Sequence, residues 1–151
     1  MATESAGILG FRRSRGVLEV LLVHPGGPFF AKKDAGAWSI PKGLIEGDGL
    51  LAEAMREFQE ETGLSITGEA IPLGSIRQKS GKIVQAWAVE GGWDLADFKS
   101  NTFELEWPPK SGKRQTFPEA DRAGWFNMAE AREKILAAQA EFLDRLIEHL
   151  G

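Results

Sequence analysis

Hydrophobic residues near the start of the chain follow the pattern of a β-hairpin. Residues 6–13 and 16–24 are rich in apolar and β-branched side chains, and Ser-Arg-Gly at positions 14–16 interrupts them. Such runs, separated by a short segment containing glycine, predict a strand, a turn and a second strand. The sequence His-Pro-Gly-Gly-Pro at positions 24–28 then predicts a loop.

The pattern changes over residues 50–62. Apolar residues recur there at spacings of three and four, which describes one face of an α-helix. Gly63 follows as a residue suited to the left-handed conformation of a helix C-cap. Asp48 stands just before the helix and is a candidate N-cap. The predicted apolar face consists of Leu51, Ala54, Met55 and Phe58.

Short apolar segments predict the rest of a sheet, and residues 128–150 predict a closing helical segment in two pieces. Strands and helices in this order, with mostly antiparallel hairpins and a turn at Ser80–Gly81, predict an α+β fold. We expect one domain over residues 1–151. The further strands are expected at 37–40 (ending at Pro41), 70–78, 82–90, 102–107 and 123–126. The residues of the last segment expected to face the core are Leu136, Phe142, Leu143, Leu146 and Leu150.

Composition narrows the class of protein. The chain of 151 residues is 42% hydrophobic and 26% charged, which is typical of a globular protein. It has no cysteine, so a disulfide framework, a thiolate nucleophile and a zinc site built on sulfur are excluded. No apolar run reaches the length of a signal peptide or a membrane span, so we expect a cytoplasmic protein without a membrane partner. The net charge of −4 does not favour nucleic acid, and an anionic substrate would need a metal ion or a local basic cluster.

Three glutamates in the predicted helix point to metal chemistry. Glu57, Glu60 and Glu61 are spaced at i, i+3 and i+4, so they share one face, and Glu53 extends the stripe by one turn. Like charges at this spacing destabilise a helix, and these lie near its C-terminus, where the helix dipole disfavours them. A bound divalent cation reverses that argument, because hard cations such as Mg²⁺ prefer carboxylate oxygens. The alternative at this point is a solvated acidic face.

The stretch GLIEGDGLLAEAMREFQEETGL at residues 43–64 resembles the Nudix box. That motif consists of Gly, five residues, Glu, seven residues and then Arg-Glu-apolar-any-Glu-Glu-any-Gly-apolar. In the first half, Asp48 stands in place of the motif's Glu, and Gly43 lies one residue too close to the helix. The lead-in Trp-Ser-Ile-Pro-Lys-Gly at 38–43 is also similar to that of many members. The second half matches at Arg56, Glu57, Phe58, Glu60, Glu61, Gly63 and Leu64.

The resemblance implies a Nudix-type α/β/α sandwich with a mixed central β-sheet. It also implies a hydrolase that uses Mg²⁺, or alternatively Mn²⁺, to cleave a diphosphate linkage in a nucleotide-like substrate. Arg56 would hold Glu57 or a neighbouring carboxylate by a salt bridge. The implied metal ligands are the side chains of Glu57, Glu60 and Glu61 and the carbonyl of Gly43.

A further carboxylate is expected to take a proton or to add a metal ligand. Many Nudix members supply a glutamate from the loop before the final strand, and Glu119 occupies that loop here. Asp121, Glu104 and Glu106 are weaker candidates. A solvated loop position is the alternative for each of them.

The residues that bind substrate are less determined by the sequence. Lys42, Lys33 and Arg77 are our candidates for phosphate contacts, with Lys32, Lys79 and the basic loop at 110–114 as further ones. The alternative for that loop is a solvated connection. The tryptophans are typical of core or sheet-face positions, and we assign none of them to a nucleobase.

The substrate and oligomeric state stay open. The Pro-Lys-Gly lead-in resembles members that act on dinucleoside polyphosphates, diphosphoinositols or RNA 5′ ends. A sugar nucleotide or a mutagenic triphosphate is an alternative substrate. A different class of function is a Nudix-fold sensor that binds a nucleotide without efficient catalysis.

Overall fold

Two long strands form the centre of the sheet in the computed structural model, which describes residues 4–45 and 49–151. Strand β1 (Glu4–Ser14) pairs antiparallel with β2 (Val17–Pro25), from Gly10 opposite Leu21 to Ser14 opposite Val17. The turn between them places Arg15 and Gly16 at positive φ angles of 52° and 79°. The hairpin expected from the alternation of apolar residues is therefore present.

The main sheet has the order β4-β5-β1-β2-β8, and β3 (Lys42–Leu44) pairs with β1. Strands β1 and β5 run parallel, whereas the other pairs are antiparallel, so the sheet is mixed as expected. The other strands of this sheet are β4 (Ala70–Arg77), β5 (Ile83–Glu90) and β8 (Ala120–Asn127).

The third strand does not lie where the sequence predicted it. Residues 37–40 form only isolated bridges, from Trp38 to Ile135 and from Ser39 to Val23, and the strand begins after Pro41. Pro41 has no N–H to donate to a β-ladder. The apolar run at 37–40 is therefore separated from the residues that pair with β1. Strand β3 therefore consists of the residues that lead directly into the acidic motif.

Helix α1 (Leu50–Thr62) has the bounds that the sequence predicted. Gly63 caps it in the left-handed conformation, with a φ of 72°, and its N–H donates to the carbonyl of Gln59 at 2.7 Å. The N-cap residue is Gly49, which offers no side chain to the helix. The candidate cap Asp48 lies outside the described residues.

The C-terminal helical segment is divided in two, as expected. Helix α2 (Met128–Lys134) begins with a capping box between Asn127 and Glu130, and α3 (Ala140–Leu150) follows a short 3₁₀ turn, η2 (Ala137–Gln139). Leu136 was expected to face the core, but it is only half-buried, and Ile135 is buried instead. Because the helix is interrupted between α2 and η2, Leu136 does not continue the apolar face on which the sequence analysis placed it.

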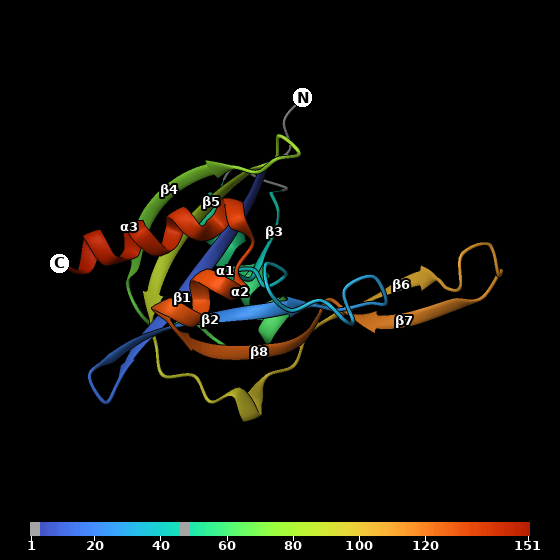
Figure 1. Cartoon of the computed structure of the whole chain (residues 1–151), viewed down its shortest axis with the longest axis horizontal. Helices are drawn as coiled ribbons and strands as arrows, with labels where there is room; N and C mark the ends of the chain where they lie inside the picture. The colour runs from blue at the N-terminus through green and yellow to red at the C-terminus, as the bar shows by residue number, and fades with distance from the viewer. Residues whose placement is uncertain (1–3, 46–48) are drawn as a thin grey trace.

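The helices cover opposite faces of the sheet, which gives the α/β/α arrangement (Figure 1). Successive residues of a strand point to opposite faces. Ile8 of β1 therefore belongs to the same core as Phe58 of α1, whereas Leu9 belongs to the core that contains Leu143 and Leu146 of α3. The alternation along β1 builds two separate cores, one on each side.

A second, two-stranded sheet extends from this body as an arm (Figure 1). It consists of β6 (Thr102–Glu106), within the predicted strand at 102–107, and β7 (Arg114–Pro118), which the sequence analysis did not predict. The polar residues of β7 carry no apolar alternation. Trp107, which directly follows β6, packs edge-to-face on Phe29 with ring centroids 5.3 Å apart.

Among residues 4–45 and 49–151, no helix has the length and apolar character needed to cross a membrane.

Phe58 holds α1 against the sheet, and its replacement should show how strongly. The Phe58 side chain is fully buried, whereas Met55 on the same helix is 37% exposed, despite its expected core position. We expect Phe58→Ala to lower the free energy of unfolding by about 3–5 kcal/mol through the cavity it leaves. Met55→Ala should change it by roughly 0.5 kcal/mol. Urea denaturation measures both, and equal losses would contradict this packing.

Candidate active site

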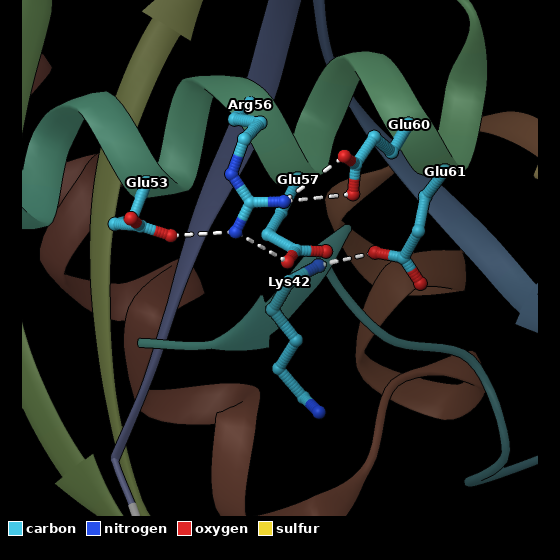
Figure 2. A network of polar contacts seen from close by, with 6 residues as sticks. All are labelled: Lys42, Glu53, Arg56, Glu57, Glu60 and Glu61. Carbon is cyan, nitrogen blue, oxygen red and sulfur yellow. Dashed lines mark hydrogen bonds and ion pairs between the residues drawn. The ribbon is translucent and has the colours of Figure 1, made fainter. Parts of the chain in front are cut away.

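One guanidinium group organises the acidic face of α1 (Figure 2). Arg56 donates to both carboxylate oxygens of Glu60 at 2.9 and 3.0 Å, to Glu53 at 2.6 Å and to Glu57 at 3.1 Å. These carboxylates raise the pKa of Arg56 above its usual range, first through the hydrogen bonds to Glu53 and Glu60. A single cation thus gathers three of the four glutamates on this face.

Gly43 lies directly against the carboxyl group of Glu57. A Cβ atom at position 43 would stand 1.9 Å from the Cδ atom of Glu57, which no side chain can occupy. With any other residue at position 43, the carboxyl group of Glu57 would have to move from this position. Although the connecting loop is one residue shorter than the motif, Gly43 still lies beside the first glutamate of the helix half.

Glu61 points away from the Arg56 cluster and is held by the backbone of β3. Its Oε2 atom accepts a hydrogen bond of 2.5 Å from the backbone N–H of Lys42. Burial raises the pKa of the Glu61 carboxyl to about 8, and the hydrogen bond from Lys42 only partly offsets this effect. The charges of Glu119 and Glu57 raise it further. A group buried in this way favours its neutral form unless a cation joins it.

Glu119 reaches the same region from the junction of β7 and β8, as the sequence predicted for its loop. Its N–H donates to the carbonyl of Asn101 at 2.8 Å, and the N–H of Asn101 donates to the carbonyl of Glu60, also at 2.8 Å. One residue therefore connects the end of α1 to the Glu119 loop. Burial raises the pKa of Glu119, and the charge of Glu60 adds to the effect.

The donor set of this region fits a hard cation. It offers carboxylate and carbonyl oxygens, and the pKa of Glu57 is raised by burial and by the charges of Glu60 and Glu119, against the effect of Arg56. Mutual repulsion of this kind is what a divalent cation would relieve. Within the described part of the chain, no three acidic, histidine or cysteine side chains are already arranged around one metal position. Arg56 contacts carboxylate oxygens of both Glu57 and Glu60 in this arrangement.

A cavity of about 180 Å³ opens between the end of α1 and the β7–β8 junction. Glu61 and Glu119 lie on its wall, and Phe30, which is 38% exposed, lies there too. Its remaining lining residues are Val23, Pro25, Ala37, Ser39, Lys42 and Leu136. The cavity thus joins acidic groups to an aromatic ring and an amine, and we call it the acidic cavity.

The predicted substrate-binding residues do not lie together. Lys42 lines the acidic cavity, although its side chain extends away from the glutamates of α1 (Figure 2). Lys33 is exposed, with its Nζ atom 5.4 Å from the centre of the Phe30 ring. Arg77 lies at the end of β4 and lines a different cavity. Lys32 is exposed in the loop before β3, and Lys79 lines the same cavity as Arg77.

The weaker acidic candidates lie elsewhere. Glu104 and Glu106 are on β6 of the arm, and Glu104 pairs with Arg114 at 3.5 Å with most of its side chain exposed. The basic loop at 110–114 is exposed at the end of the arm. Asp121 contacts His24, with 2.8 Å between Oδ1 and Nδ1.

Sequence reasoning missed three residues of this region. His24 is fully buried, and its Nε2 atom lies 2.6 Å from the carbonyl oxygen of Lys33, so it connects the loop of Phe30 to β8. Phe30 and Lys82 were also not singled out. For Phe30, the only signal in the sequence was an aromatic residue in a loop rich in glycine and proline. For Lys82 there was no signal in the sequence, because its side chain meets that of Lys42, which is distant in the chain.

Comparison with solved structures shows the fold. The chain resembles the NUDIX domain of Shewanella oneidensis NrtR complexed with ADP ribose (TM-score 0.68, 16% identity, covering 100% of this chain and 90% of that one). It also resembles a C. elegans Ap4A hydrolase binary complex (0.67, 20%, covering 97% of each chain). A MutT protein from Methanosarcina mazei is similar as well (0.63, 22%, covering 99% and 95%).

No curated protein matches the chain in sequence. The family model of the NUDIX domain matches residues 1–146 of the 151. Because this match spans nearly the whole chain, and because the acidic face of α1 carries the residues of the family motif, the chain belongs to the Nudix family.

Proposed function

We propose that this protein is a Mg²⁺-dependent hydrolase that cleaves a diphosphate linkage in a nucleoside-diphosphate-linked substrate. One observation carries the proposal. Glu61 of α1 and Glu119 of the β7–β8 junction line the same cavity, and their carboxyl groups are held there in spite of the cost of burial. Such an arrangement has no benefit for folding, but it suits binding of cations and phosphates.

The residues that would hold Mg²⁺, or alternatively Mn²⁺, are Glu57, Glu60, Glu61 and the carbonyl of Gly43. When bound, the ion neutralises phosphoryl oxygens and lowers the pKa of a bound water. Arg56 then positions the carboxylates of Glu57 and Glu60, since its guanidinium contacts both. Glu61 keeps its orientation through the backbone N–H of Lys42.

Glu119 is our candidate for the general base. Burial and the charge of Glu60 raise its pKa, which makes its carboxylate a better proton acceptor. In the reaction, the water oxygen attacks a phosphorus atom of the diphosphate, and the bond from that phosphorus to the bridging oxygen breaks. The proton of the water passes to the carboxylate of Glu119, and the bridging oxygen leaves with the other phosphate.

A dinucleoside polyphosphate is the first candidate substrate, with an RNA 5′ end as another. The similarity to a C. elegans Ap4A hydrolase over 97% of the chain supports this choice. Phe30 on the wall of the acidic cavity offers a ring for a nucleobase, and Lys42 offers a cation for phosphate.

A nucleotide sensor is the second candidate function. The similar NrtR domain was crystallised with ADP ribose, so the fold also serves a protein that holds a nucleotide-like ligand. Retention of Glu57, Glu60 and Glu61 favours the enzyme over the sensor.

A panel of substrates tests the proposal. The protein should hydrolyse one or more of a set of dinucleoside polyphosphates, nucleotide sugars, ADP-ribose and triphosphates in Mg²⁺ or Mn²⁺, and EDTA should abolish the turnover. Glu60→Gln should remove most activity, whereas Glu106→Gln, which changes an exposed glutamate of the arm, should leave it unchanged. Absence of turnover on every compound would favour the sensor, and full activity of Glu60→Gln would refute this metal site.

Glu119→Gln tests the assignment of the base. We expect kcat to fall by about 10²- to 10⁴-fold, since the variant cannot accept the proton. Mg²⁺ affinity measured by calorimetry should stay nearly constant if Glu119 acts only as the base, and should fall if it is also a ligand. Glu104→Gln is the matched control, because Glu104 is exposed and pairs only with Arg114 among the described residues. A kcat of Glu119→Gln close to that of the control would exclude the role.

Glu61→Gln tests the burial of a charge in the metal-free protein. Since the pKa of Glu61 is raised from 4.5 to about 8, the folded state binds a proton that the unfolded state has released. Stability should therefore be fully present below pH 4.5 and decline as the pH rises towards 8, with a slope approaching roughly 1.4 kcal/mol per pH unit. Urea denaturation in EDTA from pH 5 to 8 should show this decline weakened in Glu61→Gln. Identical slopes for the two proteins would contradict the burial of this carboxyl.

A further inference from the structure

A second and larger cavity lies next to the acidic cavity. Its volume is about 800 Å³, and it is formed by the turn between β4 and β5 on one side and by the start of η2 on the other. Figure 1 shows this turn and the beginning of α3 at the same end of the sheet. The lining residues are Gly36, Arg77, Gln78, Lys79, Ser80, Leu136, Ala137 and Ala138.

The charges of this second cavity are opposite to those of the first. Arg77 and Lys79 are its charged lining residues, and neither forms an ion pair with a carboxylate within residues 4–45 and 49–151. The only side-chain hydrogen bond of Arg77 in that part of the chain is a long one, 3.4 Å, to the carbonyl of Gly81. Both cations are therefore available to an anionic ligand.

The two cavities meet at one side chain. Leu136 lines both of them, and the neighbours Gly36 and Ala37 line one each. Leu136 is fixed by its backbone N–H, which donates to the carbonyl of Trp38 at 2.8 Å. The helix break that moved Leu136 out of the core thus places it between the cavities.

A buried amide connects the walls of the two cavities. The Nε2 atom of Gln139, a fully buried residue, donates to Ser39 Oγ at 3.1 Å and to Gln78 Oε1 at 3.3 Å. Ser39 lines the acidic cavity and Gln78 the second one.

We propose that the second cavity binds the far end of an extended polyphosphate substrate, namely the distal phosphate and second nucleoside of a dinucleoside polyphosphate. This inference rests on the proposed function and specifies its substrate class. Arg77 and Lys79 would meet the distal phosphate, and the apolar floor of Leu136, Ala137 and Ala138 would accept the nucleoside. A phosphate alone needs much less space than 800 Å³, whereas ligand sites of this size hold molecules as large as a nucleotide.

Three variants separate the two ends of the ligand. Arg77→Ala removes a cation of the second cavity, and Ala137→Trp fills the cavity from an exposed position. Arg13→Ala is the control, since it removes one positive charge from an exposed position near the end of β1. Urea midpoints close to that of the wild type establish that each variant folds.

Kinetics are measured with Ap4A and with adenosine 5′-tetraphosphate, which lacks the second nucleoside. We expect Arg77→Ala to raise KM for Ap4A on the order of tenfold by loss of a charge-assisted contact, with kcat nearly unchanged. Ala137→Trp should raise KM for Ap4A but not for adenosine 5′-tetraphosphate, and Arg13→Ala should alter neither. Equal effects of Ala137→Trp on both compounds, or no effect of Arg77→Ala, would overturn the inference and leave the proposed function intact.

If the wild-type protein hydrolyses neither compound, binding measurements test whether the second cavity holds the distal end of Ap4A. Calorimetry with Ap4A in Mg²⁺ should then still show tighter binding to the wild type than to Arg77→Ala or Ala137→Trp. Absence of Ap4A binding to the wild type would refute the second cavity as a nucleotide site. Failure of hydrolysis and failure of this inference are thus distinguished.

Discussion

The ion pairs of Arg56 are the interaction on which the acidic site depends. Glutamates at i, i+3 and i+4 repel one another on a helix, and the C-terminal end of a helix disfavours them further. The guanidinium offers donors in a planar fork, so it can contact several carboxylates at once. Arg56 uses this geometry to hold Glu53, Glu57 and Glu60. The helix can therefore carry a concentration of negative charge before any cation arrives, while one carboxylate, Glu61, stays outside the cluster.

The position of α1 relative to the other elements is set by packing and by its caps. Phe58 anchors the helix on the sheet, and the carbonyls near its end accept hydrogen bonds from the loop before β6. Asn101 belongs to this loop. Its backbone N–H donates to the carbonyl of Glu60, and its carbonyl accepts from the N–H of Glu119. These two hydrogen bonds satisfy backbone groups and also bring Glu119 to the acidic face. Asn101 therefore both caps the end of α1 and positions the candidate base Glu119.

Local patterns in the sequence predicted much of the fold, but contacts between distant segments were beyond them. Helix α1 was predicted to its bounds because its apolar spacing and Gly63 are local signals. Strand β7 was missed because it pairs in an exposed arm without apolar alternation, and Leu136 was misplaced because the helix breaks beside it. In the site, the helix glutamates follow from the motif, whereas the positions of Phe30 beside the acidic cavity and of Lys82 beside Lys42 depend on which elements meet in space.

The separation of charge between the two cavities bears on how an anionic substrate would bind. The chain carries a net charge of −4, and the acidic cavity alone would repel phosphates. Cations at the opposite end, Arg77 and Lys79, have no acidic partners in the described part of the chain and lie one residue, Leu136, away from that cavity. In the proposed binding mode, a chain of phosphates laid across Leu136 would place one end near the glutamates and the other among the basic residues. A single short diphosphate would not span both cavities, so this binding mode would favour longer phosphate chains.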